Sequence, residues 1–157
     1  MSFRISGLRA EPFTSLFGLD DEALARAGAR RYIADAKPGF PCRVTLEDAE
    51  PGERVLLVHY VHQPADTPFH ASHAIYVREN ASRTASFVDE IPASLRGRQL
   101  SVRAFDATHM MIDADLADGA NLEALVQRLL VNDATSYLHV HYAKRGCYAA
   151  LVERACS

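Results

Sequence analysis

Two histidines near the end of the chain, His139 and His141, are separated by a single residue. Side chains alternate along a strand, so both histidines share one face with Tyr137, and the residues between them form an apolar opposite face. Neighbouring imidazoles on one strand face can share a ligand or a metal ion. The following stretch, Ala143 to Arg145, offers no carboxylate of the kind that completes cupin-type metal sites. The pair indicates either a binding site or two histidines on a half-buried sheet face.

The turn after this strand decides whether Cys147 joins the histidines. A three-residue loop, Lys144 to Gly146, places the glycine in the left-handed position and sets Cys147 on the histidine face. A two- or four-residue loop places Tyr148 there and turns Cys147 into the core. We expect the three-residue loop because it uses the glycine where a glycine is needed. A thiol beside imidazoles could be a nucleophile or a soft metal ligand, although such a cysteine is more often a small core residue.

Arginines supply the second chemical group. Arg78 and Arg103 alternate with apolar residues and are therefore expected on sheet faces, where a guanidinium must be paired. A structural ion pair is the simpler interpretation for Arg103, with Asp106, Asp113 or Asp115 as its partner. The alternative is an anion pocket in which Arg43, Arg78 or Arg103 holds a carboxylate or phosphate through two parallel hydrogen bonds.

Four of the five remaining histidines form two H-x-x-H pairs, His59 with His62 and His70 with His73, and His109 is expected in a loop. That spacing suits metal binding on a helix, but not on a strand, where the two side chains face opposite ways. His62 is at the end of its expected strand, so its side chain is less constrained than that of His59 inside the strand. Calcium-binding EF-hand loops, P-loops, G-x-G-x-x-G, G-x-S-x-G and paired C-x-x-C motifs are all absent from the sequence.

Composition limits the class of protein. The chain has 157 residues, of which 48% are hydrophobic and 24% charged, and a net charge of -3. These values are typical of one globular domain, residues 1–157, that needs no disulfide or metal to fold. Three cysteines, Cys42, Cys147 and Cys156, fit reduced thiols better than a disulfide framework. We expect a soluble, cytoplasmic protein with no nucleic-acid or membrane partner. Its oligomeric state is left open.

Periodicity predicts an α+β fold, a mainly antiparallel sheet with a helix at about residues 120–131 packed on one face. Asp118 or Asn121 is expected to cap this helix. Strands are expected at Phe3–Leu8, Arg30–Ile33, Glu53–Val61, Ala74–Arg78, Gln99–Phe105, Met110–Leu116, Ser136–Ala143 and Cys147–Arg154. Short helices are expected over Glu22–Arg26 and from Pro92 to Leu95, and Asn80–Glu90 is expected to be a polar connection.

Several blocks resemble an uncharacterised bacterial family, domain of unknown function 1203. They are Lys37–Arg43, His62–Asp66, Ile75–Glu79, Ser101–Asp106 and the segment from His139 to Cys147. The resemblance spans nearly the whole chain, and it implies no particular activity. Its blocks contain the same polar residues that strand alternation singles out.

The leading hypothesis is a small-molecule-binding protein, or an enzyme, with an anionic ligand in a pocket on the sheet face. Arginines would orient the anion, a histidine would exchange protons near neutral pH, and a cysteine would supply sulfur. The candidate ligand-binding residues are Cys42, Arg43, His62, Arg78, Arg103, His139, His141 and Cys147. No metal or cofactor is assigned; a metal-dependent variant would use His139 and His141 with His62 or Cys147. The alternative is an interaction or structural module without a ligand site.

Overall fold

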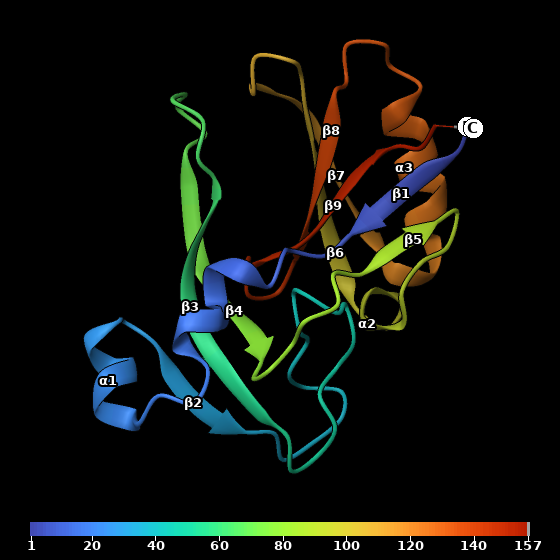
Figure 1. Cartoon of the computed structure of the whole chain (residues 1–157). Coiled ribbons are helices and arrows are strands. Elements are labelled where there is room, and N and C mark those ends of the chain that lie inside the picture. Colours follow the sequence, from blue (N-terminus) through green and yellow to red (C-terminus); the bar gives the residue numbers. More distant parts are fainter. Residues whose placement is uncertain (157) are drawn as a thin grey trace.

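The computed structural model describes residues 1–156, which form two antiparallel sheets (Figure 1). A six-stranded sheet has the order β5-β1-β9-β8-β6-β7, and a three-stranded sheet has the order β2-β3-β4. The strands are β1 Phe3–Ser6, β2 Arg30–Ile33, β3 Arg54–Gln63, β4 Ala71–Arg78, β5 Ser86–Val88, β6 Gln99–Phe105, β7 Met111–Asp118, β8 Tyr137–Tyr142 and β9 Tyr148–Arg154. The helices are α1 Asp21–Arg26, α2 Ala93–Arg96 and α3 Leu122–Leu130, with 3-10 turns at Glu11–Leu16 and Gly119–Asn121. The expected α+β class is confirmed.

Helix α3 covers one face of the six-stranded sheet, as its apolar stripe predicts (Figure 1). The buried face of α3 packs on the inward residues of the central strands, among them Val102 in β6 and Val140 in β8. Burial of these side chains removes apolar surface from water, which is the main stabilising contribution to the fold. The opposite face of β6 and β8 carries Arg103, His139 and His141, because the side-chain period of a strand is two.

The three-stranded sheet stands beside that polar face. Its middle strand, β3, is paired on both sides, by β2 and by β4. The inner part of β3 is buried, with Leu56 and Val58 in a second apolar cluster. The outer part is not, since Val61 is 41% exposed. The last residues of β3 therefore reach beyond the core, towards the polar face of β6 and β8.

Three other expectations need correction. Strand β5 lies inside the predicted polar connection and pairs with β1, because backbone pairing at a sheet edge needs little apolar sequence. Asn121 is the residue before α3, but its side chain makes no capping hydrogen bond, and neither does that of Asp118 before the preceding 3-10 turn. The turn after β8 has four residues, since Tyr142 N–H donates to the Cys147 carbonyl and Gly146 N–H to the Tyr142 carbonyl.

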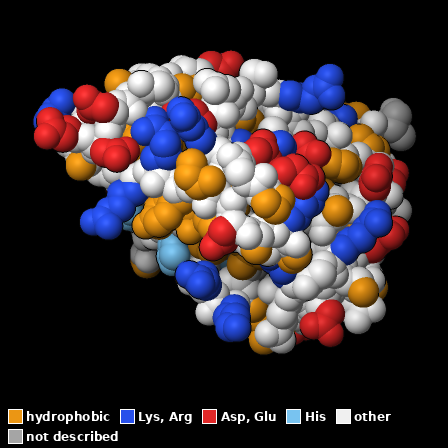
Figure 2. Space-filling model, turned by 90° about the horizontal axis from the view of Figure 1, so that it is seen from below, with side chains coloured by type: hydrophobic (Ala, Val, Ile, Leu, Met, Phe, Trp, Pro, Cys, Tyr) orange, Lys and Arg blue, Asp and Glu red, His pale blue; other side chains and the backbone are white. Residues whose placement is uncertain are grey.

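No helix in residues 1–156 has both the length and the apolar character needed to cross a membrane. On the face shown in Figure 2, basic, acidic and hydrophobic side chains are interspersed, so no extended area of one charge sign covers it.

Candidate metal centre

Three imidazoles meet between the two sheets. His139 and His141 come from β8, and His62 comes from the end of β3. The ring centroid of His62 lies 4.9 Å from that of His141 and 6.2 Å from that of His139. One nitrogen from each ring lies within 4.8 Å of the others. Residues from distant parts of the sequence thus form a compact group of nitrogen donors.

Local backbone geometry explains why His62 reaches this group. The pairing of β3 with β4 is regular as far as Tyr60 and then shifts between Tyr60 and Gln63. A bulge of this kind turns the strand and re-aims the side chains in it. The His62 ring then stacks on Tyr148 of β9, with centroids 5.5 Å apart and planes inclined by 9°. The aromatic contact holds the third imidazole against the six-stranded sheet.

One hydrogen bond determines the tautomer of His141. Its Nδ1 lies 2.9 Å from the Gly146 carbonyl oxygen, which only accepts, so Nδ1 carries the proton and donates. The lone pair is therefore on Nε2, which is buried and has no hydrogen-bond partner. A histidine that donates one ring N–H to a backbone carbonyl and presents its other nitrogen is the usual arrangement of a metal ligand.

The other two rings also have buried nitrogens without partners, His62 Nδ1 and His139 Nδ1. Buried polar atoms are nearly always hydrogen-bonded in proteins, since an unpaired one costs about 1–3 kcal/mol. Each ring of this one group has such an atom, so three missing hydrogen bonds are concentrated in one place. A cation that accepts all three lone pairs would remove it.

The electrostatic environment keeps these rings neutral. Burial, together with the nearby Arg103 and the other histidines, lowers the pKa of His139 and of His141 to about 3. Burial and Arg103 lower the pKa of His62 to about 4. At neutral pH all three rings thus present free lone pairs. The proton-exchange role near pH 7 that the sequence suggests does not fit these residues.

Arg103 lies directly opposite His139 in the pairing of β6 with β8. Its Nε is 3.5 Å from Ser101 Oγ, and within residues 1–156 it forms no ion pair. The acidic partners expected from the sequence are used elsewhere. Asp113 and Asp115 pair with Arg128 of α3, and Asp106 accepts hydrogen bonds within its own loop. The expected structural ion pair is therefore wrong, and a half-buried cation borders the histidines without a counter-ion.

A cavity of about 460 Å³ adjoins the cluster. His62 and His139 form part of its wall, and the rest comes from the β3–β4 connection and the β6–β7 loop. At its edge the Tyr137 hydroxyl accepts a hydrogen bond from Gln63 Nε2 at 2.9 Å and shares a second hydrogen bond with His109 Nδ1 at 2.7 Å. A small molecule in this cavity would reach the cluster and meet a polar rim.

Four of the eight predicted site residues come together here: His62, Arg103, His139 and His141. Cys147 does not join them, because the four-residue turn places Tyr148 opposite His141. Arg43 and Cys147 contact each other in a different cavity, at the other end of β8. The predicted single pocket is therefore divided.

The last two predicted residues have structural roles. Arg78 forms a two-point ion pair with Glu53 at the start of β3 and also contacts Glu47. Cys42 is buried in the second apolar cluster, where its sulfur accepts the backbone N–H of Arg78. Neither residue approaches the histidines, so Arg78 follows the simpler interpretation given above for sheet-face arginines.

Sequence reasoning did not single out three residues of the site. Tyr148, which stacks on His62, would have followed from the four-residue turn. Gln63 and His109 follow from no strand pattern, because they lie at a bulge and in a loop. His109 adopts a positive φ of 65°, and nothing in the short sequence between the two strands predicts this conformation.

The profile of a family described as protein of unknown function, DUF1203, matches residues 39–154. The chain belongs to this family. The match includes every predicted site residue, and the resemblance seen in the sequence is thus confirmed. No curated protein and no solved structure shows significant similarity to the chain. Family membership assigns no activity, so the functional argument depends on the geometry of the site.

Proposed function

We propose that this protein binds a divalent transition-metal ion through His62, His139 and His141 and receives a small anionic ligand or substrate beside that ion. The observation that carries the proposal is the convergence of the three histidines: one nitrogen of each ring lies within 4.8 Å of the others, and each ring has a buried nitrogen without a hydrogen-bond partner. Each alone could be a packing defect. Together, on neutral rings, they form a donor set that transition metals such as Zn²⁺ prefer.

The number of ligands indicates the kind of site. Structural zinc sites use four protein ligands, whereas catalytic sites use three and leave a position for water or substrate. Three histidines carry no charge, so a bound ion would keep its full double charge, and Arg103 adds another positive charge at its side. Anions would be attracted to the open position. In such a site the metal polarises a bound water or substrate oxygen, as in metal-assisted hydrolysis and hydration.

The donor atoms need to draw together on binding. Ligands about 2.0–2.1 Å from a tetrahedral ion are roughly 3.3 Å apart, so the nitrogens would close by at most about 1.5 Å. Rotation of three side chains supplies this movement. His62, half-buried at the end of its strand, is the ring with most freedom to move.

Metal binding is tested on protein made without a metal-affinity tag. We expect titration calorimetry with Zn²⁺ and with Co²⁺ to give one ion per chain, and bound Co²⁺ to show the strong visible absorption of a tetrahedral site. The variants His139→Gln and His141→Gln should each weaken binding at least tenfold, as loss of one ligand does more damage than loss of an outer-shell partner. The exposed His70→Gln is the matched control and should bind like the wild type.

Two results would contradict the proposal. One is the absence of stoichiometric binding for either metal, and the other is wild-type affinity in both His139→Gln and His141→Gln. The anionic part is tested separately, by titrating azide or phosphate into the Co²⁺-loaded protein and following its visible spectrum. A spectrum that no anion changes would leave a metal site with no ligand-binding role.

A further inference from the structure

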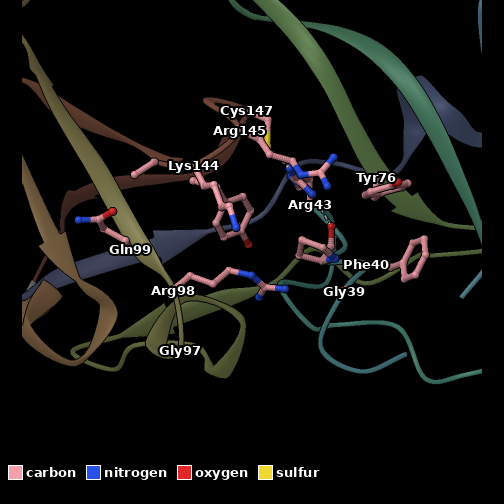
Figure 3. Close-up of a pocket in the computed structure, with 13 residues that line it drawn as sticks. Gly39, Phe40, Arg43, Tyr76, Gly97, Arg98, Gln99, Lys144, Arg145 and Cys147 are labelled. Carbon is pink, nitrogen blue, oxygen red and sulfur yellow. Dashed lines mark hydrogen bonds between the residues drawn. The ribbon is translucent and has the colours of Figure 1, made fainter. Parts of the chain in front are cut away.

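A second cavity, of about 780 Å³, lies at the Tyr142 end of β8, whereas the cavity beside His62 and His139 lies at the Tyr137 end (Figure 3). Its walls come from the Gly39–Arg43 segment, the start of β6 and the turn between β8 and β9. We call it the arginine cavity, because Arg43 and Arg98 line it. It shares no lining residue with the cavity beside the histidines.

Arg43 is the most unusual residue of the arginine cavity. It is only 2% exposed, yet it forms no ion pair within residues 1–156. Three of its N–H groups have partners: Nε donates to the Tyr148 carbonyl at 2.8 Å, Nη1 to the Pro41 carbonyl at 2.6 Å and Nη2 to Cys147 Sγ at 3.0 Å. A guanidinium has five N–H donors, so two are left over. Buried charges in proteins are ordinarily paired, and here the counter-ion is missing.

No neighbouring group among the described residues supplies the counter-ion that Arg43 lacks, and the cavity holds further positive charges. Arg98 pairs with Asp48, at 2.7 and 3.1 Å, but Asp48 does not line the cavity, and no carboxylate is among the described lining residues. The guanidinium carbons of Arg43 and Arg98 both lie close to the Tyr142 ring, at 4.9 and 5.1 Å from its centroid. Lys144 and Arg145 at the rim are exposed and form no ion pair among the described residues. Four cations thus line a space whose described wall contains no carboxylate.

The remaining wall is aromatic. Phe40 and Tyr76 pack edge to face with centroids 5.1 Å apart, and Tyr142 lies beside the two guanidiniums. In Figure 3, Phe40 and Tyr76 border one side of the space that Arg43 and Arg98 enter. Flat apolar groups stack well against such rings, whereas a bare inorganic ion would leave them unused. The wall therefore favours a ligand with both a charge and a flat apolar part.

We propose that the arginine cavity is a second binding site, independent of the metal centre, for a small anion with a flat apolar body, such as an aryl carboxylate or an aryl phosphate. The anionic group is bound by Arg43 and Arg98 with Lys144 and Arg145 at the rim, and the ring lies against Phe40 and Tyr76. Guanidiniums suit this task because their planar N–H groups match the oxygens of carboxylates and phosphates.

The experiment uses chelator-treated protein, so that an anion on the metal centre cannot contribute, and three probes that differ in one property each. Phenyl phosphate has charge and ring, inorganic phosphate has charge alone, and benzyl alcohol has a ring alone. We expect thermal stability and calorimetry to show binding in the order phenyl phosphate, inorganic phosphate, benzyl alcohol. Stability should rise with the concentration of a probe that binds the folded state only.

The double variant Lys144→Ala/Arg145→Ala should weaken phenyl phosphate binding roughly tenfold, since each exposed cation contributes modestly. Both residues are exposed, so folding should be unaffected. Arg9→Ala/Arg26→Ala removes the same charge from exposed positions outside the cavity and should bind like the wild type. In a Cys156→Ser background, phenyl phosphate should also slow modification of Cys147 by a thiol reagent, because the thiol lines the same space.

Two outcomes would overturn the proposal. If the two double variants weaken binding equally, the anion is attracted by net charge and not by this cavity. If no probe stabilises the protein or protects Cys147, then Arg43 only ties the Pro41 and Tyr148 backbones together and has a purely structural role. Either result leaves the metal proposal standing, since the chelated protein does not test it.

Discussion

At the scale of single residues, the difference between His141 and an ordinary core histidine lies in its two nitrogens. One donates to the Gly146 carbonyl, and the other is buried with nothing to accept from or donate to. A histidine that serves packing alone would satisfy both atoms or expose one. His139, 6% exposed, lies beside it and also has a buried ring nitrogen, Nδ1, without a hydrogen-bond partner. Incomplete hydrogen bonding, more than residue type, supports the proposal that these rings are metal ligands.

Arg103 should affect cations and anions in opposite directions. The Arg103→Met variant keeps the length of the side chain and removes a positive charge that lowers the pKa of all three histidines. We expect Zn²⁺ to bind more tightly, by up to about tenfold, because repulsion of roughly 1.4 kcal/mol corresponds to one such factor. Azide or phosphate should bind the Co²⁺-loaded protein more weakly. Calorimetry and visible spectroscopy measure the two effects separately.

A structural role for Arg103 would give a different result. Loss of stability with unchanged metal and anion affinities would show that the guanidinium only packs against the sheet. Arg128→Met is the matched control, because that arginine pairs with Asp113 and Asp115 away from the cluster and should alter neither affinity.

At the scale of elements, the β8–β9 turn determines the chemistry of the face. Gly146 has a positive φ of 81°, as the sequence suggests, but this conformation serves a four-residue turn as well as a three-residue one. The difference of one residue exchanges Cys147 for Tyr148 beside the histidines. Glycine at the end of the turn therefore does not determine the register, and only the pairing of Tyr142 with Cys147 does.

Glycine adopts this left-handed conformation without strain, but a residue with a side chain at position 146 would not. A Cβ at position 146 would meet no atom within 4 Å, so Gly146→Ala tests backbone conformation without a clash. We expect the free energy of unfolding to fall by about 1–2 kcal/mol, the usual cost of a left-handed conformation for a residue with a Cβ. Gly97→Ala is the control, because Gly97 has a φ of -91° and equally open surroundings. Equal losses in urea unfolding of both variants would contradict the role assigned to φ.

Elements with strong local signals were predicted well from sequence. Strand β2 has the expected bounds, and Asp20 caps α1 through the backbone N–H of Ala23. Helix α3 follows its apolar stripe, and α2 lies within one residue of the short helix expected from Pro92 to Leu95. Strand β5 was missed, because it is formed by pairing with β1 and not by a pattern of its own. Its sequence, Ser86–Val88, is too short to show a period.

At the scale of the molecule, the site depends on how the two sheets face each other. Strand alternation is a property of one strand, and it correctly places His139 and His141 together. The approach of His62 to these two histidines depends on the bulge after Tyr60 and on packing between the sheets. One such contact joins Tyr60 and Tyr148, whose ring centroids are 6.2 Å apart. No local pattern encodes either feature. Nor could the sequence separate Cys147 and its contact Arg43 from the histidines, since the length of the β8–β9 turn decides on which face Cys147 lies.

The cluster also makes the stability of the whole protein depend on pH. The three histidines have lowered pKa values in the folded state, about 3 to 4, against about 6.5 in the unfolded chain. Between these values the unfolded state binds more protons, so metal-free protein loses stability as the pH falls below about 6.5. Each histidine contributes a slope of up to about 1.4 kcal/mol per pH unit. Urea unfolding of the chelated protein at pH 7, 6 and 5 measures this loss.

Bound Zn²⁺ should oppose that loss near neutral pH and fail in acid, because protons and the metal compete for the same lone pairs. The variant His139→Leu/His141→Leu should flatten the slope, as it removes two of the groups that must stay unprotonated in the folded state. The exposed pair His59→Leu/His70→Leu should not. If the slope persists in His139→Leu/His141→Leu, the acid sensitivity arises from other residues. The argument that burial keeps these imidazoles neutral and able to bind a metal would then fail.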